Sequence, residues 1–499
     1  MRRTSLAMLA LLSAGTVLGA CTVGPDYKSP PAPRVTGYTP TPLPVQTSAA
    51  DNRHGAAQHF VVDMDIPGQW WTLFHSENLN RLITQSLVAN PTLAAAQAAL
   101  RQARENAIAQ RGSYYPQVSA GFSASRNLTP VAALSPASAS GNPYYSLITP
   151  QLNVSFVPDV FGANRRAVES LEAQTENQRF QLEATYLTLT SNVAAAAIQE
   201  ASLRAQIDAA QATIKIENDL LGILGRQLSL GQVAGVDVAA QEAALAQAQQ
   251  ALPPLQKQLD QQRDLLAALT GHPPSEQPAE TFELTGLTLP VDLPVSLPAK
   301  LVAQRPDVQA AEATMHAASA QIGMAVAARL PQITLTGQVG SSANQLSNLF
   351  TPGTNFWTLA AGITQPLFEG GTLLHKQRAA EAGFDQAAAQ YQSTVLSALQ
   401  NVADTLHALQ ADADALQAAV AAERAAARTL SITRQQLALG QIAYLALLNA
   451  QQVYQQALLS LVQAQANRLA DTAALFQALG GGWWNRTDVA VTRDKTAQN

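Results

Sequence analysis

Two stretches of the chain are nearly identical: Leu228-Ser229-Leu230-Gly231-Gln232-Val233-Ala234 and, in the second half, Leu437-Ala438-Leu439-Gly440-Gln441-Ile442-Ala443. Their positions differ by an offset of 209. Two earlier proline pairs, Pro91 with Pro306 and Pro116 with Pro331, share one offset of 215. A register that shifts only once along so long a chain indicates an internal duplication. The first half therefore carries about six additional residues between positions 118 and 228, and the loop at 127–143 is their expected place.

Each half has the same order of predicted elements: a helix, a strand, a loop, a second strand, a very long helix and a final helix. The helices are expected at 79–111, 163–230 and 236–269 in the first half, and at 296–328, 372–439 and 444–479 in the second. The very long helices lack proline and are rich in Ala, Gln, Leu and Glu, which favour helix. Each would be on the order of 100 Å long and would need partner helices along its whole length. The pair Pro253-Pro254 is predicted to interrupt the last helix of the first half, so that the halves differ in bend.

The four predicted strands have apolar and polar residues in alternation, and they lie at 117–126, 151–157, 332–341 and 356–366. Strands of about ten residues with this pattern are typical of transmembrane β-barrels, although a half-buried soluble sheet has the same pattern. A four-stranded sheet with open edges in lipid would leave backbone groups unsatisfied. A barrel therefore requires several chains: two would give eight strands around side chains, and three would give twelve strands around a passage.

The composition excludes several classes of protein. The chain has 499 residues with a formal net charge of -5, and 13% of them are charged, about half the usual fraction. The negative charge argues against nucleic-acid binding, and the single cysteine excludes a disulfide framework. The seven histidines lack the H-E-x-x-H spacing, and Gly480-Gly481-Gly482 lacks the lysine of a phosphate-binding loop. We therefore expect no enzyme activity, no cofactor other than a covalent lipid, and no metal site.

The N-terminus has the features of a secretory signal, expected at residues 1–20. Arg2 and Arg3 precede a short apolar stretch, which is too short to span a bilayer. The signal ends in Leu18-Gly19-Ala20-Cys21, which resembles the bacterial lipobox, in which a cysteine receives lipid after cleavage. Cys21 is thus the predicted lipidation site, and a free buried cysteine is the alternative. Several acyl chains together give stable membrane anchoring. Thr22 after it favours the outer membrane over inner-membrane retention.

Five further stretches carry a resemblance to a known family. They are Cys21-Thr22-Val23-Gly24-Pro25-Asp26-Tyr27, Trp70-Trp71-Thr72-Leu73-Phe74, Pro366-Leu367-Phe368-Glu369-Gly370-Gly371, Tyr444-Leu445-Ala446-Leu447-Leu448-Asn449-Ala450-Gln451 and Ala478-Leu479-Gly480-Gly481-Gly482-Trp483-Trp484. In this order, and together with the lipobox, they are similar to TolC-type outer-membrane efflux proteins. The similarity is to the NodT-type outer-membrane lipoprotein subgroup, which serves resistance-nodulation-division efflux systems.

The resemblance implies a mixed α/β membrane protein: a homotrimer with a twelve-stranded transmembrane β-barrel and a periplasmic α-barrel of long helices. It implies a periplasmic adaptor protein and a proton-driven inner-membrane pump as partners, and no nucleic acid. The expected division of the chain is a lipidated linker and belt segment at 21–78, repeats at 79–270 and 296–479, a belt linker at 271–295 and a belt segment and tail at 480–499. The expected function is a passive exit duct for small toxic compounds such as drugs. The alternatives are a lipid-anchored structural coiled-coil protein that transports nothing, and the same duct serving type I protein secretion.

The turns that contain Gly231 and Gly440 are expected at the periplasmic tips, where glycine suits the left-handed position after a helix. In the family these tips close the tube and meet the adaptor, and acidic residues just after them often form a ring at the constriction. Asp237 matches such a position; the alternative is a solvated charge at a helix N-terminus. Asn449 stands where relatives often have aspartate, so it cannot supply charge to a second ring, and a hydrogen bond between neighbouring tips is its alternative role. Tyr444 is either a packing latch or an ordinary helix-packing aromatic residue.

Overall fold

The structure is a computed structural model and describes residues 22–128 and 144–486. The signal at 1–20, the lipidation site Cys21, most of the loop at 127–143 and the last residues of the tail lie outside the described residues. The first half contains α2 (Glu77–Ala89), α3 (Pro91–Arg111), β2 (Gln117–Leu128), β3 (Tyr144–Phe156), α4 (Ala163–Ser229) and α5 (Gly235–Leu269). The second half contains α6 (Pro298–Gln304), α7 (Pro306–Ala327), β5 (Gln332–Ser341), β6 (Asn355–Thr364), α8 (Thr372–Ala438) and α9 (Tyr444–Ala478). Outside the repeats are β1 (His59–Val62), β4 (Asp292–Val295) and the short 3-10 helices η1 (Trp70–Phe74) and η6 (Trp483–Asn485).

The two halves are close copies of each other, as the repeated stretches predict. The helices α4 and α8 have 67 residues each, and α5 and α9 have 35 each. The starts of α3 and α7, and of β2 and β5, have the offset of 215, whereas those of α4 and α8 have the offset of 209. The six extra residues therefore lie between the start of β2 and the start of α4, in the β2–β3 hairpin. The mainly helical fold with two long hairpins confirms the expected fold class.

The prediction of one continuous helix at the start of each half, over 79–111 and 296–328, is wrong, because each is divided by a proline. Asn90 lies between α2 and α3 and has an extended backbone (ψ 122°), and its side chain accepts hydrogen bonds from the amides of Thr92 (2.9 Å) and Leu93 (3.3 Å). Arg305 between α6 and α7 is likewise extended (ψ 120°). The ring of a proline excludes helical geometry from the residue before it. The same proline suits the first position of a new helix, so each one ends one helix and begins the next.

The predicted interruption at Pro253-Pro254 is also wrong, because α5 continues through both residues. Both prolines lie on an exposed face of the helix. The carbonyls that lose their amide partners can therefore be hydrated, which lowers the cost of keeping proline in a helix. The predicted difference in bend between the halves stays a prediction.

The described residues form two compact units. The first contains residues 22–29, 100–178 and 311–391, apart from the undescribed residues 129–143, and it includes the four-stranded sheet. The second contains residues 30–99, 179–310 and 392–486. The helices α3, α4, α7 and α8 have residues in both units. Each unit is considered by itself below.

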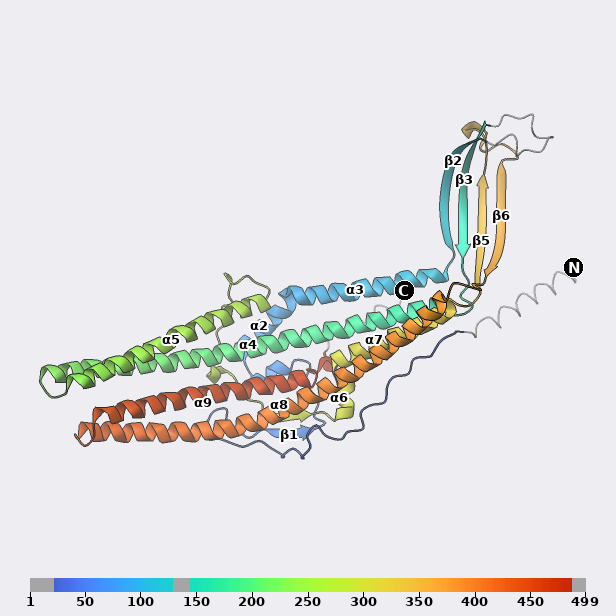
Figure 1. Ribbon diagram of the computed structural model, residues 1–499. Helices are drawn as coiled ribbons and strands as arrows, with labels where there is room; N and C mark the ends of the chain where they lie inside the picture. Colours follow the sequence, from blue (N-terminus) through green and yellow to red (C-terminus); the bar gives the residue numbers. More distant parts are fainter. Residues whose placement is uncertain (1–21, 129–143, 487–499) are drawn as a thin grey trace. The chain divides into compact units, whose positions relative to one another are not determined.

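The first unit contains an antiparallel sheet with the strand order β2-β3-β5-β6, which Figure 1 shows as a single layer. The strands β5 and β6 match their predicted positions to within two residues, whereas β3 begins seven residues earlier than predicted. The two hairpins meet where β3 pairs with β5. Neither β2 nor β6 has a strand partner on its outer side within the part of the chain that the structure describes. The sheet is therefore open at both edges.

The second unit joins the segments outside the repeats to α9. Two strands that the sequence analysis missed, β1 and β4, pair in parallel and bring residues 59–62 against residues 292–295. Arg468 of α9 is completely buried and donates hydrogen bonds to the carbonyls of His54 (2.9 Å) and Ala56 (2.7 Å). Trp70 of η1 stacks on Phe476 of α9, with ring centroids 5.4 Å apart. These contacts fix the residues that precede the first repeat to the final helix of the second repeat, and the assignment of those residues to a belt stays a prediction.

Candidate functional site

The strand register divides the sheet into one mainly apolar and one mainly polar face. Val118 is opposite Val154, Leu152 is opposite Val339, and Gly337 is opposite Leu359, so these residues share one face. The apolar face contains Val118, Ala120, Phe122, Ala124, Ile148, Leu152, Val154, Phe156, Ile333, Leu335, Val339, Trp357, Leu359, Ala361 and Ile363. The other face is mainly polar, with Leu147, Ala360 and Phe356 as exceptions, and it contains Gln117, Ser119, Ser123, Thr149, Gln151, Asn153, Ser155, Thr334, Thr336, Gln338, Thr358 and Thr364. One apolar face and one polar face is the pattern of a barrel wall between lipid and a water-filled passage.

The apolar face is exposed on the strands at the sheet edges. Trp357 is 77% exposed, Leu359 78% and Ile363 72% on β6, and Phe122 is 67% exposed on β2. An exposed apolar surface of this kind marks contact with lipid or with another protein. None of the described helices is long and apolar enough to cross a membrane.

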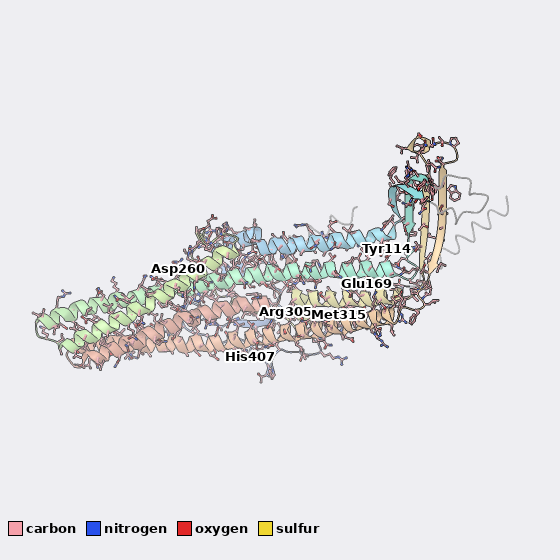
Figure 2. All side chains as sticks on the ribbon, turned by 45° about the horizontal axis from the view of Figure 1, so that its top comes forward. Tyr114, Glu169, Asp260, Arg305, Met315 and His407 are labelled. Atoms are coloured by element: carbon pink, nitrogen blue, oxygen red, sulfur yellow. The ribbon has the colours of Figure 1, made fainter. Side chains whose placement is uncertain are left out.

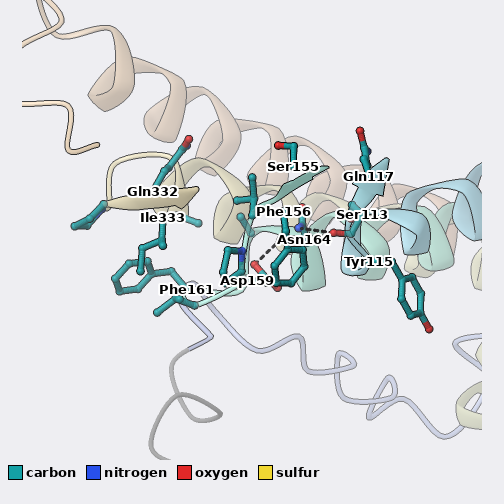
Figure 3. Close-up of a pocket in the computed structure, with 16 residues that line it drawn as sticks. Ser113, Tyr115, Gln117, Ser155, Phe156, Asp159, Phe161, Asn164, Gln332 and Ile333 are labelled. Atoms are coloured by element: carbon teal, nitrogen blue, oxygen red, sulfur yellow. Dashed lines mark hydrogen bonds between the residues drawn. The ribbon is translucent and has the colours of Figure 1, made fainter. Parts of the chain in front are cut away.

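A cavity of about 360 Å³ lies at the base of the sheet, where β3 ends and β5 begins (Figure 3). Its lining includes Phe156, Phe161 and Ile333. Asp159, between β3 and α4, accepts hydrogen bonds from the amides of Asn164 and Arg165, both at 2.9 Å. A carboxylate at a helix N-terminus satisfies free amides and matches the helix dipole. The connection from β3 to α4 is therefore held in one conformation.

The segment just after the predicted lipidation site lies against α4 and α7 in the first unit. The buried guanidinium of Arg166 donates to the carbonyl of Val23 (3.1 Å) and to the carboxylate of Asp26 (2.7 Å). Gly24 has a φ of +92°, and a Cβ atom there would collide with the Cα of Gly323. Only glycine fits this approach without strain. Residues 22–26 therefore have a defined place beside the start of α4.

Aromatic and acidic groups hold the next residues of the same segment. Tyr27 stacks on His316 of α7 with ring centroids 4.3 Å apart, and its hydroxyl donates to Glu312 (3.3 Å). Burial and the negative charge of Glu312 raise the pKa of Tyr27, so the hydroxyl stays protonated. Nε2 of His316 lies 3.0 Å from Oε1 of Glu169 on α4, and Figure 2 labels Glu169. We name residues 22–29 the N-terminal segment, and its contact residues Arg166, Glu169, Glu312 and His316 were missed by the sequence analysis.

The two predicted tips have the same turn. The amide of Gly231 donates to the carbonyl of Leu228, and the amide of Gln232 donates to that of Gln227, both at 2.9 Å. The second turn repeats the pattern, with Gly440 bonded to Leu437 and Gln441 bonded to Gln436. This is the Schellman motif. Gly231 has a φ of +67° and Gly440 a φ of +71°, as the prediction of left-handed glycines requires.

Asp237 caps the start of α5. Its carboxylate accepts a hydrogen bond from the amide of Ala234 at 3.3 Å, and the helix begins at Gly235. Because Ala234 has no side-chain acceptor, only this half of a capping box is present. The position suits a partly exposed acidic residue stabilised by the helix dipole. Its place in a ring of three carboxylates stays a prediction.

Tyr444 belongs to a buried polar network at the tips of α4, α5 and α9. Its hydroxyl donates to Oε1 of Gln241, and Nε2 of Gln241 donates to the carboxylate of Glu217 (2.6 Å). Gln241 is completely buried, and Tyr444 is 8% exposed. Burial, then the charges of Glu217 and Asp237, raise the pKa of Tyr444. Burial also raises the pKa of Glu217. Sequence reasoning found Tyr444 but neither of its partners.

Asn449 is exposed on α9, near its N-terminal end. It lines a cavity of about 500 Å³ between α8 and α9, together with Ala446, Ala450 and Val453. Its hydrogen bond to a neighbouring tip stays a prediction. Among the described residues, no group of three or more His, Cys, Asp or Glu side chains is placed to hold a metal ion.

A sheet with one apolar and one polar face, joined to helices of 67 residues, is the architecture of an outer-membrane channel with a long helical part. The model of the family described as outer membrane efflux protein matches residues 82–272 and 297–481, and the chain belongs to this family. The chain is an outer-membrane channel component of an efflux system, located in the outer membrane with a large periplasmic part.

Two relatives with known roles match nearly the whole chain. The toluene efflux pump outer membrane protein TtgC of Pseudomonas putida is 29% identical over 485 residues, which are 97% of each chain. The pyoverdine export outer membrane protein OpmQ of Pseudomonas aeruginosa is 28% identical over 492 residues, 96% of this chain and 98% of OpmQ.

Two solved structures have the same fold. The outer-membrane channel OprN is 26% identical with a TM-score of 0.82, covering 93% of this chain and all of OprN. The open state of the MtrE channel of Neisseria gonorrhoeae is 27% identical with a TM-score of 0.78, covering 94% of this chain and all of the MtrE chain.

Proposed function

We propose that three copies of the chain form a passive exit duct, with a twelve-stranded barrel in the outer membrane and a tube of long helices in the periplasm. The observation that supports this most is the open sheet with one apolar face. In lipid, the free backbone groups of β2 and β6 must find partners. Three copies close the ring with twelve strands, which is wide enough for a passage.

We propose further that the duct has no enzymatic activity and draws its energy from a proton-driven inner-membrane pump through a periplasmic adaptor. The tips support contact with another protein, because they expose apolar side chains in matching places. Leu230 and Val236 on one tip are each 71% exposed, and Leu439 (71%) and Leu445 (62%) are exposed on the other. Exposed apolar groups at the end of a periplasmic tube favour a protein partner.

We propose small toxic compounds as the cargo. One relative is named for toluene efflux and another for pyoverdine export, and both cargoes are small molecules. The polar face of the sheet consists largely of Ser, Thr, Asn and Gln. Such a wall is neutral and selects by size rather than by specific contacts.

We propose that Cys21 carries the lipid anchor, with no other cofactor. The place of the N-terminal segment supports this, since the amide of Val23 donates to the carbonyl of Phe161 (3.1 Å) and Thr22 packs against Gly162. Both contacts are at the connection between β3 and α4, at the base of the sheet. A lipid attached one residue before Thr22 would therefore start beside the membrane-spanning strands.

The deciding experiment is reconstitution of the purified protein in planar bilayers, together with complementation of a deletion strain. We expect a trimer that conducts ions and restores resistance to small toxic compounds. The double variant with Leu230→Ser and Leu439→Ser, one change at each tip, should fail to restore resistance but should still form the trimer. A monomeric helical protein without conductance would support a structural coiled-coil role instead, and a defect limited to one secreted protein would support type I secretion.

A further inference from the structure

Arg126 is the only charged residue in the two segments that form the sheet and its loops. Residues 112–158 and 330–368 contain all four strands of the sheet, and Arg126 is their one Lys, Arg, Asp or Glu. They contain no histidine either. An arginine side chain stays charged at physiological pH. A single charge in so neutral a surface therefore marks a position with a particular role.

The strand register puts Arg126 on the mainly apolar face of the sheet. Alternate residues of a strand share a face, so Phe122 and Arg126 of β2 point to the same side. Phe122 is opposite Pro150 of β3, and Arg126 is opposite Ser146. The side chain of Arg126 is exposed. The charge is thus on the side that the proposed barrel turns towards lipid.

Arg126 lies just beyond the outer limit of the apolar surface. On β3 the apolar face runs from Phe156, at the end near the helices, to Ile148. This stretch is about 27 Å long at 3.4 Å per residue, or about 21 Å of membrane at a strand tilt of about 40°. The apolar band of a membrane barrel is about 25 Å tall. The next residue outward on this face is Ser146, opposite Arg126, so both lie at the level of the lipid head groups.

The other strands have the same outer limit. The pair Ser341 of β5 and Asn355 of β6 ends the apolar run on the second hairpin, on the same face. Beyond Arg126, Leu128 is opposite Tyr144, which is 54% exposed. Aromatic side chains at this level form the girdle of a membrane barrel. The outer end of the face therefore has the composition of a membrane interface, with one charge in it.

The protein provides no counter-ion for Arg126 at this level. The nearest acidic residues along the chain are Glu105 in α3, Asp159 before α4 and Glu369 before α8, all at the end of the sheet where the helices begin or beyond it. Within the part of the chain that the structure describes, the Arg126 side chain forms no hydrogen bond or ion pair. Basic groups at a membrane surface attract anionic lipid head groups. A guanidinium also matches a phosphate group with two parallel hydrogen bonds.

We propose that Arg126 and Ser146 bind a phosphate group of lipopolysaccharide in the outer leaflet, with an acyl chain of the same molecule along Phe122 and Ile148. Lipopolysaccharide is the phosphorylated lipid of that leaflet. The site rests on the proposed barrel and adds to it the class of lipid that the wall recognises. Each trimer has three such sites, on its outer wall and outside the passage. Loss of the site therefore leaves conductance unchanged.

Native mass spectrometry of the purified trimer tests the site by titration with defined lipids. The probes are lipopolysaccharide, the same lipopolysaccharide after enzymatic removal of its phosphates, and phosphatidylglycerol. We expect the wild-type trimer to bind up to three molecules of lipopolysaccharide. Binding should be at least about tenfold weaker for Arg126→Gln, and at least about tenfold weaker for the wild-type protein with the dephosphorylated lipid.

Two control variants separate position from charge. Arg126→Ser with Ser125→Arg moves the charge one residue along β2 to the other face, so lipid binding should be lost and the reconstituted channel should gain preference for anions. Arg101→Gln removes an exposed charge from α3 and should bind lipopolysaccharide as the wild-type protein does. Arg126→Lys keeps the charge without the fork of donors. It should form normal trimers with weaker binding, which keeps the test valid if R126Q does not assemble.

Several results would overturn the site while the proposed duct stands. Wild-type affinity in both R126Q and R126K would show that the guanidinium binds no lipid. Phosphatidylglycerol bound as tightly as lipopolysaccharide would overturn the choice of lipid. A change in ion selectivity for R126Q, with lipid binding intact, would place Arg126 in the passage. A wild-type protein that forms neither trimer nor channel would instead overturn the proposed function itself.

Discussion

Asp471 of α9 lies beside Asp412 of α8, and two neighbouring carboxylates cannot both ionise easily. Burial, together with the hydrogen bond and the charge of Asp412, raises the pKa of Asp471 to about 7. Arg468 lies one turn before Asp471 on α9 and is completely buried. Asp471 therefore holds its proton to a higher pH in the folded chain than a free aspartate does.

This pair predicts a pH-dependent stability. The pKa of Asp471 is higher in the folded state than the usual 3.8, so between these values the folded state binds more protons than the unfolded state. The contribution of Asp471 to stability must then fall as the pH rises from about 4 to about 7. Asp471→Asn should flatten the profile and raise stability at pH 7.5. Asp471 is only half-buried, so screening limits the gain to on the order of 1–2 kcal/mol.

Urea unfolding in detergent at several pH values, followed by tryptophan fluorescence, measures this effect. Asp404→Asn is the control, because Asp404 is exposed on the same helix as Asp412. A D471N profile that stays parallel to that of the wild-type protein would contradict the raised pKa of Asp471.

Tyr444 gives a second prediction for single residues. Tyr444→Phe removes the hydroxyl that donates to Gln241 and leaves a buried oxygen of Gln241 without this donor. An unsatisfied buried group costs about 1–3 kcal/mol. We expect faster hydrogen–deuterium exchange in the first turns of α5 and α9. Tyr454→Phe is the matched control, since Tyr454 is partly buried and packs against the apolar cluster that contains Tyr444, Leu447 and Leu448. Equal exchange in both variants would show that Tyr444 acts by packing alone.

The very long helices could be predicted from the sequence to within one residue, because a long stretch without proline and rich in helix-forming residues leaves few alternatives. The breaks at Pro91 and Pro306 were missed, although both prolines had marked the repeat. The opposite error occurred at Pro253, where exposure lets a helix continue through proline. The strands β1 and β4 were missed because they are too short to show an alternating pattern. They also pair a segment before the first repeat with a segment after it, and such distant pairing leaves no local signal.

The sheet gives a prediction for a whole element. Leu359→Arg puts a charge on the apolar face and Thr358→Arg puts the same charge on the polar face, one residue along β6. Arginine on the lipid face near the bilayer centre costs about 2–4 kcal/mol, whereas a residue facing the lumen changes selectivity instead. We expect L359R to reduce the trimer in outer membranes. T358R should form normal trimers with lower cation selectivity in planar bilayers. If T358R reduced the trimer and L359R did not, the assignment of the lipid-facing and lumen-facing sides would be reversed.

For the molecule as a whole, sequence reasoning found only those site residues whose role depends on their immediate neighbours in the chain. Gly231 and Gly440 were found because a Schellman turn needs a left-handed residue at one fixed position. The fixed place of the N-terminal segment could not be found in this way. Its motif was recognised, but Arg166 and His316, which hold it, lie in distant parts of the chain, one in each repeat. Only folding brings these groups together.

The N-terminal segment allows two attachments to be tested separately. One is the proposed lipid on Cys21, and the other is the set of contacts that residues 22–29 make with Arg166 and His316. Cys21→Ser should abolish labelling with radioactive palmitate, while residues 22–29 stay bound through Arg166 and His316. Arg166→Ala should have the opposite effect, with full labelling but faster protease cleavage between residues 22 and 35. Arg166 is buried and holds Val23, Gly24 and Asp26, so its loss removes several bonds at once.

Arg111→Ala is the control for this pair of variants, because Arg111 forms an exposed ion pair with Glu172 on α4, and exposed pairs contribute only about 0–1 kcal/mol. Its labelling and its cleavage should both match the wild-type protein. Palmitate labelling of C21S would refute Cys21 as the anchor. Cleavage of R166A at the wild-type rate would mean that the stack of Tyr27 on His316 and the bonds to Glu312 hold the segment without the guanidinium.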